Sequence, residues 1–287
     1  MTQTQTIKAR ISKSLEGFPL LGYAVYWSLE NIKITHSDFK ALLVKVGLDP
    51  DVAPEVRVKS ALIRAIRAET KGKKKTFHRK LTDTKDRAGF AIVDTDSVNE
   101  ENLDVTFETS TRVALDKNTK MVKIEGSNEQ SIRDSFDSFR DLYTTDMFRN
   151  VVLKLVKGDC QGIGVRPKGG VYFVPSTHNE TFQKLQALIV SFPGCSLDVI
   201  PVIDTQNAKK SMWKSLNHEI REDLDQLKLE VEELGDDPQD RSVQIRLERY
   251  KAIRAKVENY ETLLNSTADG LKMELENLTA ALTAKLV

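Results

Sequence analysis

Residues 162–175, GIGVRPKGGVYFVP, constrain the fold of this chain most, because they have the pattern of two short strands joined by a tight turn. Apolar residues alternate with glycine and arginine before the turn, and residues 171–174 form an apolar run after it. Between them, Gly169 and Gly170 tolerate the positive φ angles that a tight turn requires. We therefore predict a β-hairpin with its turn over residues 167–170.

Amphipathic segments on both sides frame this hairpin. Apolar spacing over residues 145–157 predicts a helix before it, and Thr177 and Glu180, spaced as a capping box, predict the start of a helix after it. Residues 197–203 then have the apolar pattern of a strand, in which Pro201 favours a sheet edge or a bulge. The predicted order is helix, hairpin, helix, strand.

The N-terminal half shows a similar alternation of helices and strands. We predict helices over residues 35–47 and from Pro54 onward, strands at 76–81 and 89–93, a polar loop at 97–104, and a further hairpin after it. Two helices followed by a hairpin is also the order of a winged helix. Helix–helix–hairpin units of winged-helix type are therefore one form that this region fits.

The last 80 or so residues have apolar positions that recur every three or four residues, with no strand pattern. This spacing predicts helices over residues 206–234, 238–264 and 271–286. We expect the first two to fold back as an antiparallel hairpin, and the third to be covered by that hairpin or by another subunit. The predicted fold class is thus an α+β body followed by an α-helical antiparallel coiled-coil tail, with self-association into a homo-oligomer through residues 206–287.

These patterns divide the chain into four parts. We expect a flexible N-terminus over residues 1–14, a basic α+β region over 15–126, a helix–hairpin–helix–strand region over 127–204, and the helical tail over 205–287.

Charge is segregated along the chain although the formal net charge is only +1. Residues 1–90 carry 18 Lys and Arg against 9 Asp and Glu, whereas residues 91–147 carry 6 against 13. A basic helix that leads into a basic strand is typical of a phosphate-binding surface. The predicted nucleic-acid-binding residues are Arg57, Arg64, Arg67, Lys71, Lys73, Lys74, Lys75, Arg79 and Lys80, with Arg166 and Lys168 at the hairpin turn.

An ordinary solvated surface is the alternative interpretation of the same charges. The acidic residues that follow, Asp94, Asp96, Glu100, Glu101 and Asp104, would then neutralise the basic block. Charge segregation alone fits both interpretations.

Catalytic and cofactor motifs are missing from the sequence. It has no GxxxxGK[ST] loop and no GxGxxG opening a helix, and its four histidines and two cysteines, Cys160 and Cys195, lack metal-ligand spacing. We therefore predict no catalytic residues, cofactor or metal. Two cysteines and the absence of an apolar run of roughly 18 residues predict a reduced cytoplasmic setting and no membrane span.

Three pieces of the sequence resemble a family of bacterial, plasmid and phage proteins of unknown function. They are GYAVYW at residues 22–27, VRPKGGVYFVP at 165–175 and VIPVIDT at 199–205. The resemblance covers roughly residues 18–205 and implies a prokaryotic or viral source. It implies no activity and no catalytic residues.

Three hypotheses follow for the function. The first is a non-enzymatic, oligomerising protein that binds DNA or RNA through the basic helix and strand. The second is a structural scaffold whose self-assembly through the tail is the function. The third is an enzyme with an unrecognised site.

Overall fold

The computed structural model describes residues 19–99, 104–166, 169–234 and 240–284. The chain divides into two compact units. Unit 1 contains the residues up to 30, residues 46–48 and the residues from 149 onward, and unit 2 contains residues 31–45 and 49–148. Unit 2 is thus inserted into the chain of unit 1. The N-terminal residues 1–14, for which the sequence predicts flexibility, lie outside the described residues.

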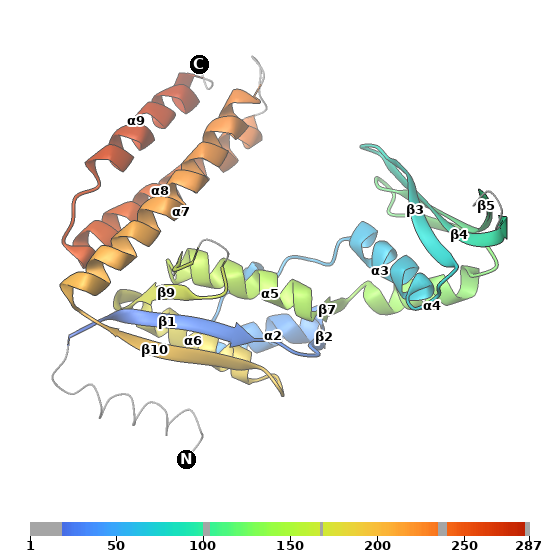
Figure 1. Ribbon diagram of the computed structural model, residues 1–287, viewed down its shortest axis with the longest axis horizontal. Coiled ribbons are helices and arrows are strands. Elements are labelled where there is room, and N and C mark those ends of the chain that lie inside the picture. Colours follow the sequence, from blue (N-terminus) through green and yellow to red (C-terminus); the bar gives the residue numbers. More distant parts are fainter. Residues whose placement is uncertain (1–18, 100–103, 167–168, 235–239, 285–287) are drawn as a thin grey trace. The chain divides into compact units, whose positions relative to one another are not determined.

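Unit 1 is built on an antiparallel sheet with the strand order β10-β1-β9-β8 (Figure 1). Its strands are β1 (Leu20–Ser28), β8 (Ile163–Gly164), β9 (Tyr172–Pro175) and β10 (Ser196–Ile203). β8 and β9 pair with each other, which confirms the predicted hairpin. β10 lies at an edge of the sheet, so Pro201 occupies an edge strand, where a missing backbone N–H is tolerated.

Gly22 in β1 allows strand β9 to approach closely. A Cβ atom at this position would lie 2.3 Å from the carbonyl oxygen of Val174 and 2.7 Å from the ring of Phe173. Both distances are well below van der Waals contact, so a larger residue would force the strands apart. Packing in the sheet therefore explains the glycine of the GYAVYW piece.

Helix α6 (Asn179–Val190) packs against this sheet. Its buried side chains are Phe182, Leu185, Leu188 and Ile189. The ring of Phe182 stacks on that of Tyr23 in β1, with centroids 5.4 Å apart. The helix predicted after the hairpin is confirmed, and so is the one before it, α5 (Thr145–Lys154), which continues into a π-helical turn (Leu155–Asp159).

Helices α7 (Gln206–Glu232), α8 (Asp240–Leu264) and α9 (Asp269–Ala284) share one hydrophobic core with the sheet of unit 1. Figure 1 shows them side by side, coloured orange to red. Leu21, Ile163 and Phe173 of the sheet belong to the same core as the buried leucines of the helices. The ring of Phe173 meets that of Tyr260 in α8 at 6.3 Å. The helices are therefore part of the folded unit.

Polar contacts join these helices to β8 as well. The amide of Gly164 donates to Oε2 of Glu219 in α7 at 2.7 Å, and Nζ of Lys256 in α8 donates to the carbonyl of Gly162 at 2.7 Å. The hydroxyl of Tyr260 donates to the carbonyl of Gln161 at 2.9 Å. Side chains of α7 and α8 thus satisfy backbone groups at the start of the hairpin.

The predicted fold class is wrong in this respect. Helices α7, α8 and α9 do not form a coiled-coil tail behind an α+β body, because their apolar stripes pack against a sheet in the same unit. Apolar spacing of three or four residues is common to coiled coils and to helices of a globular core, so the spacing alone did not separate the two.

Unit 2 begins with a small two-stranded sheet and helix α2 (His36–Val46). Strands β2 (Lys33–Thr35) and β7 (Leu142–Thr144) pair antiparallel. Tyr143 of β7 packs against Phe39 of α2, with ring centroids 4.9 Å apart, and its hydroxyl donates to the carbonyl of Pro54. A short 3-10 turn (Pro50–Val52) then leads toward helix α3.

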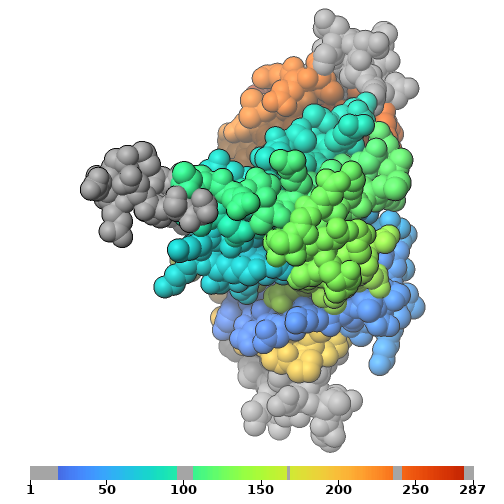
Figure 2. All heavy atoms as spheres, turned by 90° about the vertical axis from the view of Figure 1, so that its right-hand side faces the viewer, coloured from blue at the N-terminus to red at the C-terminus, as the bar shows by residue number. Residues whose placement is uncertain are grey.

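The larger part of unit 2 is a four-stranded antiparallel meander, β3-β4-β5-β6, covered on one face by two helices. The elements are α3 (Val58–Thr70), β3 (Thr76–Asp83), β4 (Arg87–Asn99), β5 (Asp104–Asp116), β6 (Val122–Gly126) and α4 (Glu129–Phe139). In Figure 2 the atoms of these elements, cyan to green, pack together on the face turned to the viewer. Apolar residues of α3 and α4 form one core with those of the three later strands, which rules out the winged-helix form.

The two central strands are longer than predicted. Residues 97–99 and 104 belong to β4 and β5 rather than to a polar loop, since Asn99 pairs with Asp104. Backbone pairing along the hairpin overrides the polar composition of these residues. Within the described residues, no helix is both long enough and apolar enough to cross a bilayer.

Candidate nucleic-acid interface

Two phenylalanines and an arginine contact one another on the unit 2 sheet. The rings of Phe77 in β3 and Phe107 in β5 meet edge to face, with centroids 5.4 Å apart. The guanidinium carbon of Arg79 lies 5.6 Å from the centroid of the Phe77 ring and 5.8 Å from that of Phe107. Phe107 is 50% exposed, whereas large apolar side chains are normally buried. We call Phe77, Arg79 and Phe107 the aromatic cluster.

Strand pairing places the aromatic cluster on the face opposite to the helices. Phe77 pairs with Val93 of β4 and Arg79 pairs with Ala91, and both partners are at most 8% exposed. The alternate residues of β4 contribute to the core formed with α3 and α4, and they are Ala88, Phe90 and Ile92. One face of the sheet is therefore core, and the other presents the aromatic cluster to solvent.

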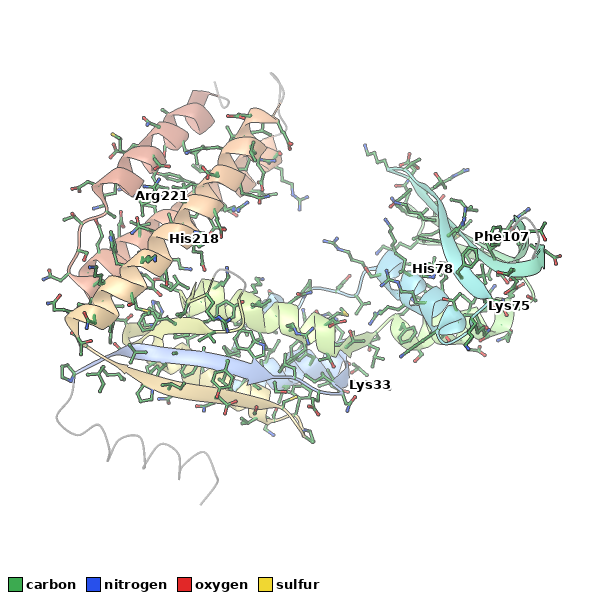
Figure 3. All side chains as sticks on the ribbon, in the orientation of Figure 1. Lys33, Lys75, His78, Phe107, His218 and Arg221 are labelled. Atoms are coloured by element: carbon green, nitrogen blue, oxygen red, sulfur yellow. The ribbon has the colours of Figure 1, made fainter. Side chains whose placement is uncertain are left out.

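The predicted cations of unit 2 are exposed, with one exception. The exposed residues are Arg57, Arg67, Lys71, Lys73, Lys74, Lys75, Arg79 and Lys80. Residues 71–75 connect α3 to β3, the strand that carries Phe77 and Arg79. Figure 3 labels Lys75 at the end of this connection and Phe107 on the sheet. Nζ of Lys73 lies 2.5 Å from Oε1 of Glu69, whose other oxygen accepts the hydroxyl of Ser131.

Arg64 is the exception, because its guanidinium is used inside unit 2. It donates to the carbonyls of Phe139 and Leu142, both at 2.9 Å, and lies over the Phe139 ring at 5.3 Å. Burial lowers the pKa of Arg64. These contacts satisfy the carbonyl of the last residue of α4 and that of the first residue of β7, and they connect α3 to both elements, so the guanidinium is not available to phosphate.

The two cations of the predicted hairpin belong elsewhere. Arg166 is exposed and lies in unit 1, two residues after the end of β8, whereas the aromatic cluster lies in unit 2. Lys168 lies outside the described residues.

Sequence reasoning did not identify Phe107 as a site residue. Phe107 and Val113 are six residues apart, so simple alternation would put both on one face of β5. Ile92 pairs with Thr111 and Val93 with Thr109, so a bulge at Ser110 shifts the register by one residue. The bulge turns Phe107 to the open face while Val113 stays in the core. The exposed Arg112, which pairs with Ala91, adds a further cation to that face.

The acidic residues expected to neutralise the basic block are described in part. Asp94 accepts the hydroxyl of Thr76, and hydrogen bonds from Thr76 and Ser110 lower the pKa of its carboxyl group, with Lys73 adding a smaller effect. The side chains of Asp96 and Asp104, together with Glu100 and Glu101, lie outside the described residues.

Metal-ligating and thiol side chains of the described residues form no further candidate site. Across the described ranges, no three His, Cys, Asp or Glu side chains are grouped so that they could hold a metal ion. Cys160 is fully buried, and burial raises the pKa of its thiol to about 12, so it is a poor nucleophile at neutral pH.

The chain belongs to a family of unknown function (DUF6744), whose model matches residues 20–286. This match extends the resemblance, expected over residues 18–205, through helices α7, α8 and α9. No curated protein and no solved structure matches the chain.

Proposed function

We propose that this protein binds single-stranded nucleic acid through unit 2, without catalysing a reaction, in the cytoplasm of a bacterium that carries it on its chromosome, a plasmid or a phage. The observation that supports this proposal is the aromatic cluster, in which the exposed ring of Phe107 and the half-buried ring of Phe77 both contact Arg79. The source follows from the sequence resemblance described above.

Each component of this surface has a matching part in a nucleic-acid strand. A base stacks on an exposed aromatic ring, and each such contact contributes about 1–3 kcal/mol. Arg79 offers a planar cation that stacks on the same bases, and the exposed lysines of residues 71–75 neutralise phosphates. The bases of a duplex are stacked on one another, so an open sheet face with aromatic rings favours single strands.

Assembly through residues 206–287 stays a prediction. The apolar positions on which it depended lie inside the core of unit 1 in the described helices, so the scaffold hypothesis has lost its main support. Deleting these residues would remove much of that core, and light-scattering mass of the intact chain is therefore the suitable test.

The function is tested by fluorescence anisotropy with nuclease-treated protein and labelled single-stranded DNA, single-stranded RNA and duplex. Phe107→Leu keeps an apolar side chain and removes the ring, so we expect about tenfold weaker binding to single strands. Val44→Ala is the matched control, because Val44 is an apolar residue of α2 that is 61% exposed. Equal affinity of Phe107→Leu and wild type would overturn the proposal.

A second variant tests the phosphate contacts. Replacing Lys73, Lys74 and Lys75 with glutamate should abolish binding at moderate salt. With the three lysines replaced by glutamine, the slope of log K against log salt should fall by roughly 2 between about 50 and 200 mM salt, since each single-strand phosphate contact contributes about 0.7. An unchanged slope would show that these lysines do not contact phosphate.

A further inference from the structure

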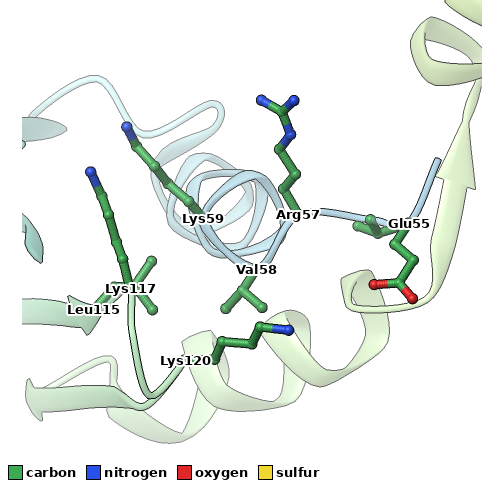
Figure 4. Close-up of a pocket in the computed structure, with 8 residues that line it drawn as sticks. Glu55, Arg57, Val58, Lys59, Leu115, Lys117 and Lys120 are labelled. Atoms are coloured by element: carbon green, nitrogen blue, oxygen red, sulfur yellow. The ribbon is translucent and has the colours of Figure 1, made fainter. Parts of the chain in front are cut away.

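A cavity of about 260 Å³ opens in unit 2 beside the start of α3 and the turn between β5 and β6 (Figure 4). Its lining residues are Glu55, Val56, Arg57, Val58, Lys59, Leu115, Lys117 and Lys120. Basic side chains thus outnumber carboxylates by four to one, over a floor of valine and leucine. We call this the basic cavity.

One neighbouring carboxylate offsets part of this charge. Oδ2 of Asp83 lies 2.5 Å from Nζ of Lys59, and its Oδ1 lies 2.8 Å from Nζ of Lys117. The side chains of Arg57 and Lys120 are exposed, and within the described residues neither has a carboxylate partner. Counting Glu55 and Asp83 against the four cations of the lining leaves a surplus of two positive charges.

The start of α3 adds to this positive potential. Arg57 occupies the N-cap position and makes no side-chain cap, and the first turn of the helix contains no acidic residue. The first N–H groups of a helix lack partners inside it, and the helix dipole makes this end positive. Arg57 and Lys59 are therefore placed where cations are unfavourable unless an anion is nearby.

We propose that the basic cavity binds a phosphate monoester dianion, with Lys120 and the first turn of α3 at the phosphate and Val56, Val58 and Leu115 against the carbon part of the ligand. The guanidinium of Arg57 extends away from Lys120 (Figure 4) and adds positive potential without contacting the phosphate. A phosphate monoester carries about −1.5 to −2 charges at neutral pH, which matches the surplus. The volume lies below the ~300 to 1,000 Å³ of drug-sized pockets, so the ligand is small or is the end of a longer one. This proposal does not depend on nucleic-acid binding by the aromatic cluster.

The test is a calorimetric titration of the full chain, nuclease-treated, with inorganic phosphate and with phenyl phosphate. We expect saturable binding that is tighter for phenyl phosphate, because its ring contacts the apolar floor. Lys120→Gln should weaken binding of phenyl phosphate roughly tenfold, as expected for the loss of a hydrogen bond to a charged group. Arg57→Gln removes only a nearby charge and should weaken binding less. Lys45→Gln, a change of an exposed lysine in α2 outside the cavity lining, should leave it unchanged.

A second arm identifies the source of the phosphate. A dinucleotide with a 5′-phosphate is compared with the same dinucleotide ending in a 5′-hydroxyl. If the 5′-phosphorylated dinucleotide binds more tightly than both its 5′-hydroxyl form and phenyl phosphate, the cavity is assigned to strand ends. If the phosphorylated dinucleotide binds more weakly than phenyl phosphate, the cavity is assigned to free phosphate esters. Both results support the proposal.

Two outcomes overturn it. The first is the lack of saturable binding of either phosphate compound, and the second is equal weakening by Lys120→Gln and Lys45→Gln. Phe107→Leu separates this proposal from the previous one, since it should weaken binding of oligonucleotides and leave phenyl phosphate binding intact.

Discussion

Nζ of Lys256 lies 2.9 Å from Oε1 of Glu219, and the two side chains are only 9% and 10% exposed. Oε2 of the same carboxylate accepts the amide of Gly164 and lies 3.3 Å from Nζ of Lys157. Burial raises the pKa of Glu219, but Lys256, the Gly164 amide and Lys157 together outweigh it, so the net pKa is lowered. Glu219 is therefore ionised inside unit 1 and needs its partners there.

Removing one member of this pair should destabilise unit 1 strongly. Lys256→Met leaves a buried carboxylate without its cation, and we expect a loss of about 3–5 kcal/mol in the free energy of unfolding, measured by urea denaturation. The double variant Lys256→Met with Glu219→Leu should recover part of that loss. Lys251→Met, at an exposed position of the same helix, is the control. A loss below about 1 kcal/mol for the single variant would contradict a structural role of the pair.

The stability of unit 2 should depend on pH through Asp83. Hydrogen bonds from Lys117 and Lys59 lower the pKa of Asp83 from 3.8 to about 2. Because the pKa is lower in the folded state, the stabilisation is complete above about pH 4 and is lost as the pH falls through 2. Asp83→Asn should therefore lower the melting temperature at pH 6 and flatten its dependence between pH 4 and 2. If the melting temperature of Asp83→Asn falls between pH 4 and 2 as steeply as that of the wild type, other carboxylates cause the loss of stability in acid.

A methyl group at position 22 should be costly. Gly22→Ala places a Cβ against the carbonyl of Val174, and we expect a loss of about 1–3 kcal/mol, as for overpacked cores. Gly270→Ala in α9 is the matched control, since nothing lies within 4 Å of its Cβ position and a helical glycine is about 0.5–1 kcal/mol less stable than alanine. In thermal unfolding, Gly22→Ala should lower the melting temperature and Gly270→Ala should raise it. This result would support the close approach of β9 to Gly22.

The two cysteines should differ in reactivity. Cys160 is fully buried with a pKa raised to about 12, whereas Cys195 is partly exposed. A thiol reagent at neutral pH should modify Cys195 quickly and Cys160 only as fast as unit 1 opens. In a Cys195→Ser variant, the remaining labelling rate should rise with urea. Fast labelling of Cys160 in the native protein would contradict its burial.

Local patterns in the sequence predicted the helices and strands well. They predicted poorly how these helices and strands pack together. The hairpin around Gly169 and Gly170, the edge strand with Pro201 and the helix after Thr177 are all present, because each depends on neighbouring residues. The packing of residues 206–284 was predicted incorrectly, since a leucine stripe does not reveal whether a sheet or another helix covers it.

The site was predictable in part for a similar reason. The charge of residues 57–80 indicated the right segment, but the role of Arg64 depends on carbonyls of Phe139 in α4 and Leu142 in β7, which are 75 and 78 residues away in sequence. The position of Phe107 depends on one extra residue at Ser110, and Gly126 accommodates that bulge, since a Cβ there would lie 2.1 Å from the Ser110 carbonyl. A register shift of this kind is not marked by particular residue types, so the sequence pattern did not predict it.

The insertion of unit 2 has a consequence for the protein during its synthesis. Strand β1 pairs with β10 and β9, and Ser28 meets Ser196, roughly 170 residues later in the chain. At about 5–20 residues per second, the ribosome needs roughly 10 to 30 s to make these partners after β1 has emerged. Unit 2 is complete by residue 148 and can fold in that interval, while the apolar segment LLGYAVYWS still lacks both strand partners.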